Sequence, residues 1–478
     1  MTAWTGWLIA LLAAYFLQFV VIFIFEHRRQ ANMTAWLFLS FVVPFIGFAA
    51  YYMIGRRRAQ LVQASAANDQ KERLAYAEER SFIVETSEWE ESALARESRL
   101  QQALARLAPF PVTGRNRTRV LTNGEETYHT MLEAMKDAKH HIHLDYYTIR
   151  NDGVGRRFLD VLTKKARRGV EVRMIYDGIG SLALDEAYLN ALREAGAECR
   201  CFAPPKAAFL ERRINFRNHR KIALIDGKVG FVGGINIGDE YIGLDPKLGF
   251  WRDTHLRVEG DAVHYLQAMF LHDWQMVGGS GIPNPEAYMH EHSIDDKERV
   301  MIVPGRPGSN DRDIVEAFVT AMAAARKRIY ATTPYFIPDP VIAASLRIAA
   351  RSGIDVKLII PGVSDSKLVL YATLSYVRDM LEAGVRVYRY RKGFIHAKVM
   401  IIDDIFASVG TANLDMRSLY SNYELLALLF DEKPIRRLER DFMEDLSVSE
   451  EIDLHAFTSR PGKQKAKEAV MHILSPML

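Results

Sequence analysis

A short polar motif occurs twice in this chain, and its repetition constrains the fold more than any other feature of the sequence. Both copies have the spacing H-x-K-x4-D. They comprise His219, Lys221 and Asp226 in the first copy and His396, Lys398 and Asp403 in the second. With 14 His and 25% charged residues in the chain, such a triple is expected by chance only about 0.05 times per chain of this composition. Two copies therefore indicate an internal duplication.

The sequence around the two motifs repeats as well. Residues 138–155 resemble 325–342, residues 167–178 resemble 351–362, and residues 192–202 resemble 381–391. Each pair has the pattern of strand, helix and strand in the same order, which is typical of an α/β fold. We therefore predict two tandem α/β halves, 109–295 and 296–478, packed around one shared site.

The N-terminal region contains two long apolar stretches. Residues 4–25 are 22 positions without a charge, and residues 35–55 are another 21. At about 1.5 Å per residue, each stretch is long enough to cross a hydrocarbon core of about 30 Å as a helix. We predict a transmembrane helical hairpin over residues 1–58. Residues 59–108 contain no Pro or Gly, and they predict a helical, mostly solvated linker.

Basic residues near the two spans indicate the orientation of this hairpin. The connection between the spans carries Arg28 and Arg29, whereas Arg56, Arg57 and Arg58 follow the second span. A hairpin leaves both of its ends on one side, and the more basic side usually faces the cytoplasm. The sequence therefore predicts a multi-pass protein of the cytoplasmic membrane with its main body on the cytoplasmic side.

The duplicated residue types indicate a particular chemistry. One imidazole can attack a substrate while a second protonates the leaving group, so two copies are expected to share one site. Two Lys, together with Asn236 and Asn413 at matching offsets, favour an anion such as a phosphoryl group and require no metal. A histidine nucleophile would give a phosphohistidine intermediate.

Strand periodicity separates the motif residues into two groups. Side chains at i and i+2 of a strand point to the same face, so His219 and Lys221 are expected to face one pocket. Asp226 and Asp403 have the opposite parity from the His of their own motif. Although both complete the H-x-K-x4-D triple, we expect supporting or structural roles for these two carboxylates.

The motif extends to H-x-K-x4-D-x6-G-[GST]-x-N, and this extended form resembles the phospholipase D superfamily. The chain as a whole resembles the bacterial cardiolipin synthases of that superfamily, through the N-terminal apolar segment and stretches such as "WRDTHLRVEG", "FIHAKVMIIDD" and "SNYELLALLFD". The resemblance implies a phosphatidyltransferase without a cofactor. One phosphatidylglycerol would give its phosphatidyl group to the enzyme with loss of glycerol, and a second would accept that group to form cardiolipin.

Site residues follow from the same resemblance. It implies that His219 is the nucleophile and that His396 is the general acid and then the base, although the reverse order stays open. The phosphate oxygens would be held by Lys221, Lys398, Asn236 and Asn413, with Thr411 as a hydroxyl donor. Gly234 stands where the superfamily often has Ser, so the equivalent contact must come from elsewhere.

Two carboxylates are candidates for fixing the second nitrogen of each imidazole. Glu424 comes 28 residues after His396 and matches a carboxylate of the superfamily. Asp253 comes 34 residues after His219, and it is the equivalent if residues 241–249 are an insertion.

Other functions remain open at this level. The chain could be a membrane-anchored hydrolase of the phospholipase D type, in which water resolves the intermediate, or a non-catalytic lipid-binding scaffold. With 62 basic and 59 acidic residues, the near-neutral charge argues against a nuclease and against a nucleic-acid partner. The expected partners are phosphatidylglycerol and other membrane phospholipids, and the sequence leaves the oligomeric state open.

Overall fold

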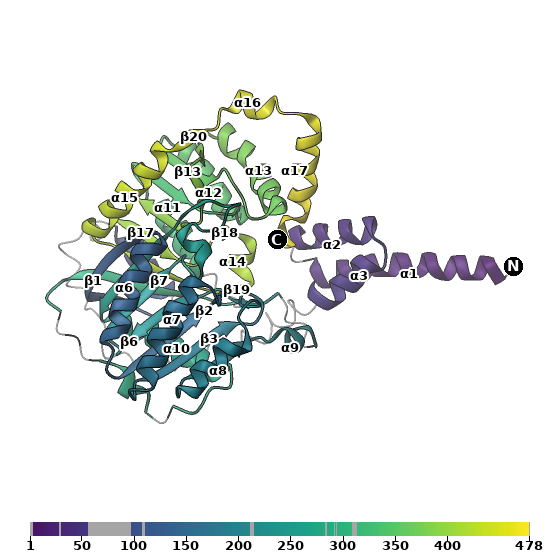
Figure 1. Cartoon of the computed structure of the whole chain (residues 1–478). Helices are drawn as coiled ribbons and strands as arrows, with labels where there is room; N and C mark the ends of the chain where they lie inside the picture. The colour runs from purple at the N-terminus through teal and green to yellow at the C-terminus, as the bar shows by residue number, and fades with distance from the viewer. Residues whose placement is uncertain are drawn as a thin grey trace.

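The computed structural model describes residues 3–27, 30–55, 97–107, 110–210, 215–282, 284–290, 292, 294–307 and 313–477. The N-terminal region contains α1 (Ala3–Glu26), α2 (Gln30–Val42), α3 (Ile46–Ala50), the π-helix η1 (Tyr51–Gly55) and α5 (Ser98–Leu107). It precedes a large α/β body, from which α1 projects (Figure 1).

Strands and helices of the first half alternate. They are β1 (Val112–Thr122), α6 (Asn123–Asp137), β2 (His141–Tyr146), α7 (Gly153–Ala166), β3 (Glu171–Asp177), α8 (Glu186–Glu194), β4 (Glu198–Phe202), α9 (Pro205–Leu210), β5 (Arg217–Asn218), β6 (Lys221–Ile225), β7 (Val229–Gly233), η4 (Asp239–Ile242), β8 (Phe250–Arg252), β9 (Thr254–Gly260), α10 (Ala262–Met276) and η5 (Pro285–Tyr288).

The second half repeats this succession and adds elements at its end. They are β10 (Glu298–Gly305), α11 (Asp313–Ala323), β11 (Arg328–Thr332), β12 (Phe336–Ile337), α12 (Pro340–Arg351), β13 (Asp355–Pro361), α13 (Lys367–Glu382), β14 (Arg386–Tyr390), β15 (Gly393–Ile395), β16 (Val399–Ile402), β17 (Phe406–Gly410), β18 (Leu414–Asp415), α14 (Met416–Tyr420), β19 (Asn422–Leu429), α15 (Glu432–Ser447), β20 (Ser449–Glu451), α16 (Leu454–Thr458), α17 (Gly462–Leu474) and η6 (Ser475–Met477).

One continuous sheet runs through both halves. In the described residues its strand order is β20-β14-β13-β11-β16-β17-β19-β10-β1-β9-β7-β6-β2-β3-β4. Reading outward from the centre, β1-β9-β7-β6-β2-β3-β4 corresponds to β10-β19-β17-β16-β11-β13-β14. The two series meet where β1 pairs antiparallel with β10. The sequence repeat is therefore a structural repeat, and the two copies are related by an approximate twofold axis at the β1/β10 junction.

Helices cover both faces of this sheet, which explains why strands such as β6 are apolar after their first residue, Lys221. Leu224 joins a central core that includes residues of α10 and α15 from both halves. Its neighbours Ala223 and Ile225 face the other side, in a core with α6, α7 and α8. A separate core of the second half contains α11, α12 and α13. The predicted fold class, tandem α/β halves, is confirmed.

The N-terminal segment differs from the predicted hairpin. Within the described ranges, one helix, Trp4–Glu26, is long and apolar enough to cross a membrane. The predicted second span, residues 35–55, is interrupted, because α2 ends at Val42 and Phe45 has φ 60°. Pro44 lacks the N–H that a continuous helix requires and disfavours the helical conformation in the residue before it. With 13 residues, α2 is about 20 Å long, which is too short to span.

The segment after Glu26 packs on the body instead. Trp36 and Tyr51 form a small apolar cluster with Ile22, and Met477 packs against it. In this way α2 lies beside α17 and η6, at the C-terminal end of the chain (Figure 1). Arg28, Arg29 and Arg56 to Arg58, which carried the orientation prediction, lie outside the described residues.

The helical linker is described only near its end. Residues 59–96 lie outside the described ranges, and Ser98–Leu107 is helical as predicted. This part is not mainly solvated, however, because Leu100, Leu104 and Leu107 are buried in the core of the second half. These side chains recur at helical spacing, so α5 is an amphipathic helix of the body.

Candidate active site

The two H-x-K segments lie at equivalent places in the sheet. His219 comes just before β6, and His396 comes just before β16. Both side chains are largely buried, with 14% and 9% of their area exposed. The ammonium groups of Lys221 and Lys398 each donate a hydrogen bond to the backbone carbonyl of the preceding His, at 2.7 and 2.6 Å.

The third members of the motifs lie in the turns that follow β6 and β16. Asp226 and Asp403 adopt positive φ angles of 55° and 48°. The Asp226 carboxylate accepts hydrogen bonds from the backbone N–H groups of residues 139, 140 and 141 at 2.7–3.0 Å. Asp403 does the same for residues 326, 327 and 328. Each carboxylate thus fixes the start of a neighbouring strand, β2 or β11, through backbone hydrogen bonds and not through strand parity, because both aspartates lie beyond the strands.

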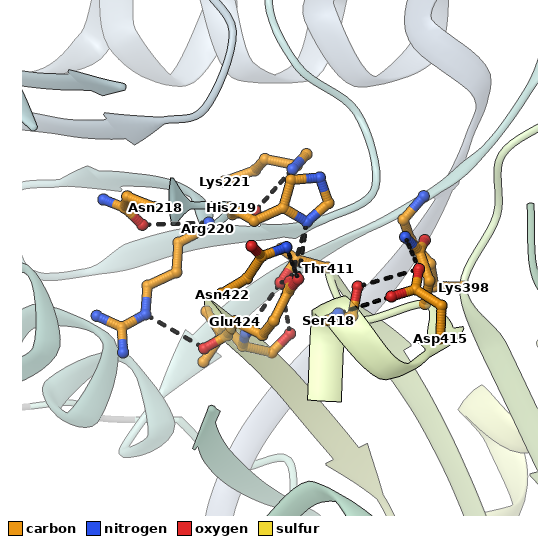
Figure 2. A network of polar contacts seen from close by, with 12 residues as sticks. Asn218, His219, Arg220, Lys221, Lys398, Thr411, Asp415, Ser418, Asn422 and Glu424 are labelled. Carbon is orange, nitrogen blue, oxygen red and sulfur yellow. Dashed lines mark hydrogen bonds and ion pairs between the residues drawn. The ribbon is translucent and has the colours of Figure 1, made fainter. Parts of the chain in front are cut away.

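Each imidazole is held by a carboxylate from the opposite half. Nδ1 of His219 lies 3.0 Å from both carboxylate oxygens of Glu424 (Figure 2). Nδ1 of His396 lies 2.8 Å from Oδ2 of Asp253. The sequence located both acids by their spacing from the motifs and assigned neither of them to one imidazole. The structure pairs each acid with the imidazole of the opposite half.

Strand pairing between the halves causes this exchange. Arg217 and Asn218 of β5 pair with Asn422 and Tyr423 of β19, and β15 pairs with β8 in the same parallel sense. As a result, the His219 N–H donates to the carbonyl of residue 423 at 2.9 Å, and the His396 N–H donates to that of residue 252 at 2.7 Å. The next residue along the chain is the carboxylate in both cases, so the same register places both acids against the opposite imidazole.

Burial keeps both imidazoles neutral. It lowers the pKa of His219 to about 4 and that of His396 to about 3, even though Glu424 and Asp253 oppose this shift. The pKa values of both carboxyl groups lie below their usual range despite burial, because each faces an imidazole and a lysine. A neutral imidazole that donates Nδ1–H to a carboxylate presents the lone pair of Nε2.

The second nitrogens of the two imidazoles have different surroundings. The Lys398 ammonium lies 2.9 Å from both ring nitrogens of His396, whereas no hydrogen bond to Nε2 of His219 occurs within the described ranges. Burial lowers the pKa of Lys221 to about 7 and that of Lys398 to about 8. The His396 side therefore has a proton donor at hand, and the His219 side has an unoccupied lone pair.

A cavity of about 520 Å³ joins the two imidazoles. His219 and His396 both line it, together with Asn236 and Asn413. Met477 of η6 also lines it, so the cavity extends to the part of the body against which α2 packs. Met477 therefore lies between the cavity and the apolar cluster of the N-terminal segment.

Three of the expected phosphate contacts differ in this structure. Lys221, Lys398 and Thr411 are not among the residues that line the cavity. The Thr411 hydroxyl donates to Glu424 at 2.5 Å, so it supports the acid rather than facing a ligand. Asn236 and Asn413 reach the cavity, with their side-chain amides donating to Tyr241 and Asp415.

Gly234 has a geometric reason to differ from the Ser that the superfamily often carries. A Cβ atom at this position would lie 2.0 Å from Oδ1 of Asp253. The missing side chain therefore leaves space for the carboxylate that holds His396.

Several cavity residues were not recognised in the sequence. They include Tyr147, Arg217, Asp415, Arg417 and Asn422. Their sequence signals were the aromatic pair at 146–147, the basic and aromatic stretch 204–217 that ends at Arg217, and the polar residues flanking the motifs. Burial raises the pKa of Asp415, which accepts a hydrogen bond from the Asn413 side chain. It also accepts one from the Ser418 N–H (Figure 2).

Comparisons with known proteins agree with this geometry. Residues 131–274 and 318–446 match the family model described as cardiolipin synthase, PLD-like domain, and residues 11–56 match that of the phospholipase D-nuclease N-terminal segment. A cardiolipin synthase of Geobacillus sp. (strain WCH70) is 42% identical over 97% of this chain and 92% of its own length. The chain belongs to the bacterial cardiolipin synthases of the phospholipase D superfamily.

Other members of this family and one solved structure extend the comparison. Cardiolipin synthase 2 of Bacillus anthracis is 41% identical over 97% of this chain and 90% of its own length. The crystal structure of phosphatidylserine synthase from Haemophilus influenzae covers 79% of this chain and 96% of its own, with a TM-score of 0.61 and 15% identity. At that identity it shows the fold alone, which is the tandem arrangement seen here.

Proposed function

We propose that this protein is a cardiolipin synthase that transfers a phosphatidyl group from one phosphatidylglycerol to another, releasing glycerol. The observation that carries the proposal is the crossed pair of His–carboxylate contacts at one cavity. Two neutral imidazoles, each oriented by a buried acid, supply one nucleophile and one acid–base group. Membership of the cardiolipin synthase family supports the same reaction.

In the first step, Nε2 of His219 attacks the phosphorus of phosphatidylglycerol. The bond from phosphorus to the glycerol oxygen breaks, and His396 gives that oxygen a proton. His219 is the nucleophile in this scheme because its Nε2 is open, whereas the Lys398 ammonium adjoins that of His396. The bound phosphodiester favours the protonated form of His396 and so raises its pKa, and His396 therefore enters this step protonated while His219 enters it neutral.

In the second step, a hydroxyl of another phosphatidylglycerol loses its proton to His396. Its oxygen attacks the phosphorus of phosphohistidine, the P–N bond breaks, and His219 is regenerated as cardiolipin forms. Lys221 and Lys398 contribute positive charge that stabilises the transferring phosphoryl group, and Asn236 and Asn413 contribute polar groups at the cavity wall.

The membrane association of the family fits the N-terminal segment. Side chains of α1 such as Trp4, Trp7 and Phe16 are more than half exposed, which is expected of a helix surrounded by lipid. We propose the cytoplasmic membrane as the location and its cytoplasmic side for the body. Support comes from the basic residues after residue 55 and from the positive-inside rule.

One experiment separates the synthase from a hydrolase. Purified protein is mixed with vesicles containing headgroup-labelled phosphatidylglycerol, and lipids and released glycerol are quantified. The proposal predicts cardiolipin and free glycerol in equal amounts. Phosphatidic acid as the only lipid product would identify a hydrolase, and no turnover would favour a lipid-binding scaffold.

A further inference from the structure

The twofold relation between the halves is broken in the cavity at two equivalent positions. Two residues before the motif His, the first half has Arg217 and the second has Phe394. Two residues before the paired carboxylate, Asn422 precedes Glu424, whereas Trp251 precedes Asp253. The His219 side is therefore polar and cationic, and the His396 side is aromatic.

Ring contacts define the aromatic side. Trp251 packs against Phe394 at 4.9 Å between ring centroids and against His396 at 5.0 Å. Arg150 also lines the cavity, but its guanidinium is already paired with the Glu240 carboxylate at 3.1 Å. A second anionic group that enters the cavity would therefore meet positive charge on the His219 side.

Two arginines gather on the polar side around Tyr147. Arg217 is 1% exposed, and its guanidinium lies 3.4 Å from the Asp177 carboxylate and from the Ala203 carbonyl. Arg417 of α14 is partly exposed and lines the same cavity. No hydrogen bond or ion pair of the Arg417 guanidinium is found among the described residues.

Tyr147 connects these guanidiniums to the reaction centre. Its ring lies 5.0 Å from that of His219, edge to face. Burial raises the pKa of the Tyr147 hydroxyl, and the positive charges of Arg417 and Arg217 oppose that rise. Both guanidiniums thus act on one phenol, beside the attacking imidazole.

Asn422 adds a hydrogen-bond acceptor to this side. It pairs with Arg217 across the β5–β19 contact and is 6% exposed. Its side-chain N–H donates to Glu424 at 3.1 Å, which leaves Oδ1 buried and without a partner in the described part of the chain. A buried acceptor without a donor is costly, and a ligand hydroxyl would satisfy it.

We propose that Arg217, Arg417 and Tyr147 form a second anion site that binds the phosphodiester of the acceptor phospholipid, with Asn422 accepting a hydrogen bond from its glycerol. This inference rests on the proposed function, because only transfer to a second phospholipid brings two phosphodiesters into one cavity. The first lies between the two imidazoles, and the second lies one glycerol away.

Two reactions of the full-length protein in vesicles test this site. Exchange of the phosphatidylglycerol headgroup with labelled free glycerol involves one phosphodiester, whereas cardiolipin formation involves two. For Arg417→Gln we expect the ratio of cardiolipin formation to glycerol exchange to fall about tenfold or more, as expected for the loss of a charged hydrogen bond. The KM for phosphatidylglycerol in cardiolipin formation should rise, and Arg417→Lys should restore part of the ratio.

Controls make each outcome decisive. Continued glycerol exchange shows that Arg417→Gln is folded, and Arg347→Gln, on the exposed side of α12 beside Asp379, should leave the ratio unchanged. An unchanged ratio in Arg417→Gln, or an equal loss of both reactions, would overturn the second anion site. Wild-type protein that exchanges or hydrolyses headgroups but forms no cardiolipin would instead refute the proposed function itself, and the acceptor site with it.

Discussion

His219 and Glu424 lie 205 positions apart in the chain, yet Nδ1 of the imidazole is 3.0 Å from both oxygens of the carboxylate. The corresponding contact of His396 with Asp253 spans 143 positions in the opposite direction. Neither half therefore contains a complete His–acid pair. The site exists only when the two halves are joined through one sheet.

Substitution of Glu424 and substitution of Asp253 should impair two different steps of the reaction. Glu424→Gln leaves the His219 ring without a charged partner, so we expect about 10- to 100-fold slower formation of phosphohistidine. Asp253→Asn should slow protonation of the leaving glycerol and deprotonation of the acceptor by a similar factor. Rapid-quench measurement of enzyme-bound phosphate and of glycerol release distinguishes the two. If Asp253→Asn specifically weakened attack by His219, the crossed pairing would be contradicted.

The aspartates of the H-x-K-x4-D motifs should matter for stability more than for chemistry. Asp226→Ala removes the acceptor for three backbone N–H groups, and we expect a loss of about 2–3 kcal/mol in the free energy of unfolding. The kcat per folded molecule should stay close to that of the wild type. Denaturant unfolding and activity of the same preparations provide the check, with Asp226→Asn as the milder control. A large loss of kcat in fully folded Asp226→Ala would place this residue in the chemistry.

The pH dependence of kcat/KM should be bell-shaped. Activity requires neutral His219, whose pKa is about 4, so the rate should fall below about pH 4. It also requires charged Lys221 and Lys398, whose pKa values are about 7 and about 8, so it should fall again as pH rises through 7 to 8. Because kcat/KM reports the free enzyme, the profile is measured at subsaturating phosphatidylglycerol in vesicles. An alkaline limb near pH 10 would mean that neither lysine is perturbed.

Lys221 should destabilise the folded protein while it serves the reaction. Burial places its folded pKa near 7, below the unfolded value, so the unfolded state binds more protons between about pH 7 and 10.4. The destabilisation is complete below pH 7 and diminishes as pH rises through that interval. Lys221→Met should thus be inactive but more stable, with a larger rise in Tm at pH 6 than at pH 9.5. A Tm below that of the wild type at pH 6 would contradict this.

The sequence predicted the duplication, both motifs and the two carboxylates, because all of these follow from spacing. It also predicted supporting roles for Asp226 and Asp403, but from strand parity, whereas both residues lie in turns beyond the strands. It did not predict which acid meets which imidazole. That pairing depends on β5 lying beside β19, a tertiary contact without a local signal. Arg217 and Asn422 were missed for the same reason, since each becomes a site residue only through the opposite half. Pro44 is a sequence signal for an interruption of the second apolar stretch, but the prediction of a second span followed the hydropathy of residues 35–55.

The N-terminal segment makes a further testable distinction. One spanning helix places residue 5 and residue 34 on opposite sides of the membrane, whereas a hairpin of two spans places residue 5 on the same side as the body. We expect a membrane-impermeant maleimide to label Thr5→Cys, but not Thr34→Cys, from outside intact cells, in a background with Cys199 and Cys201 replaced. Labelling of Thr34→Cys, with Thr5→Cys protected until the cells are opened, would instead support the hairpin.

The position of the covalent intermediate tests the roles of the two histidines most directly. Protein incubated with phosphate-labelled phosphatidylglycerol is quenched, digested and mapped, using His396→Ala to slow resolution of the intermediate. We expect the phosphatidyl label on His219, and no covalent label in His219→Ala. Label on residue 396 in His219→Ala would reverse the two roles, and turnover to cardiolipin without any phosphohistidine would contradict the mechanism.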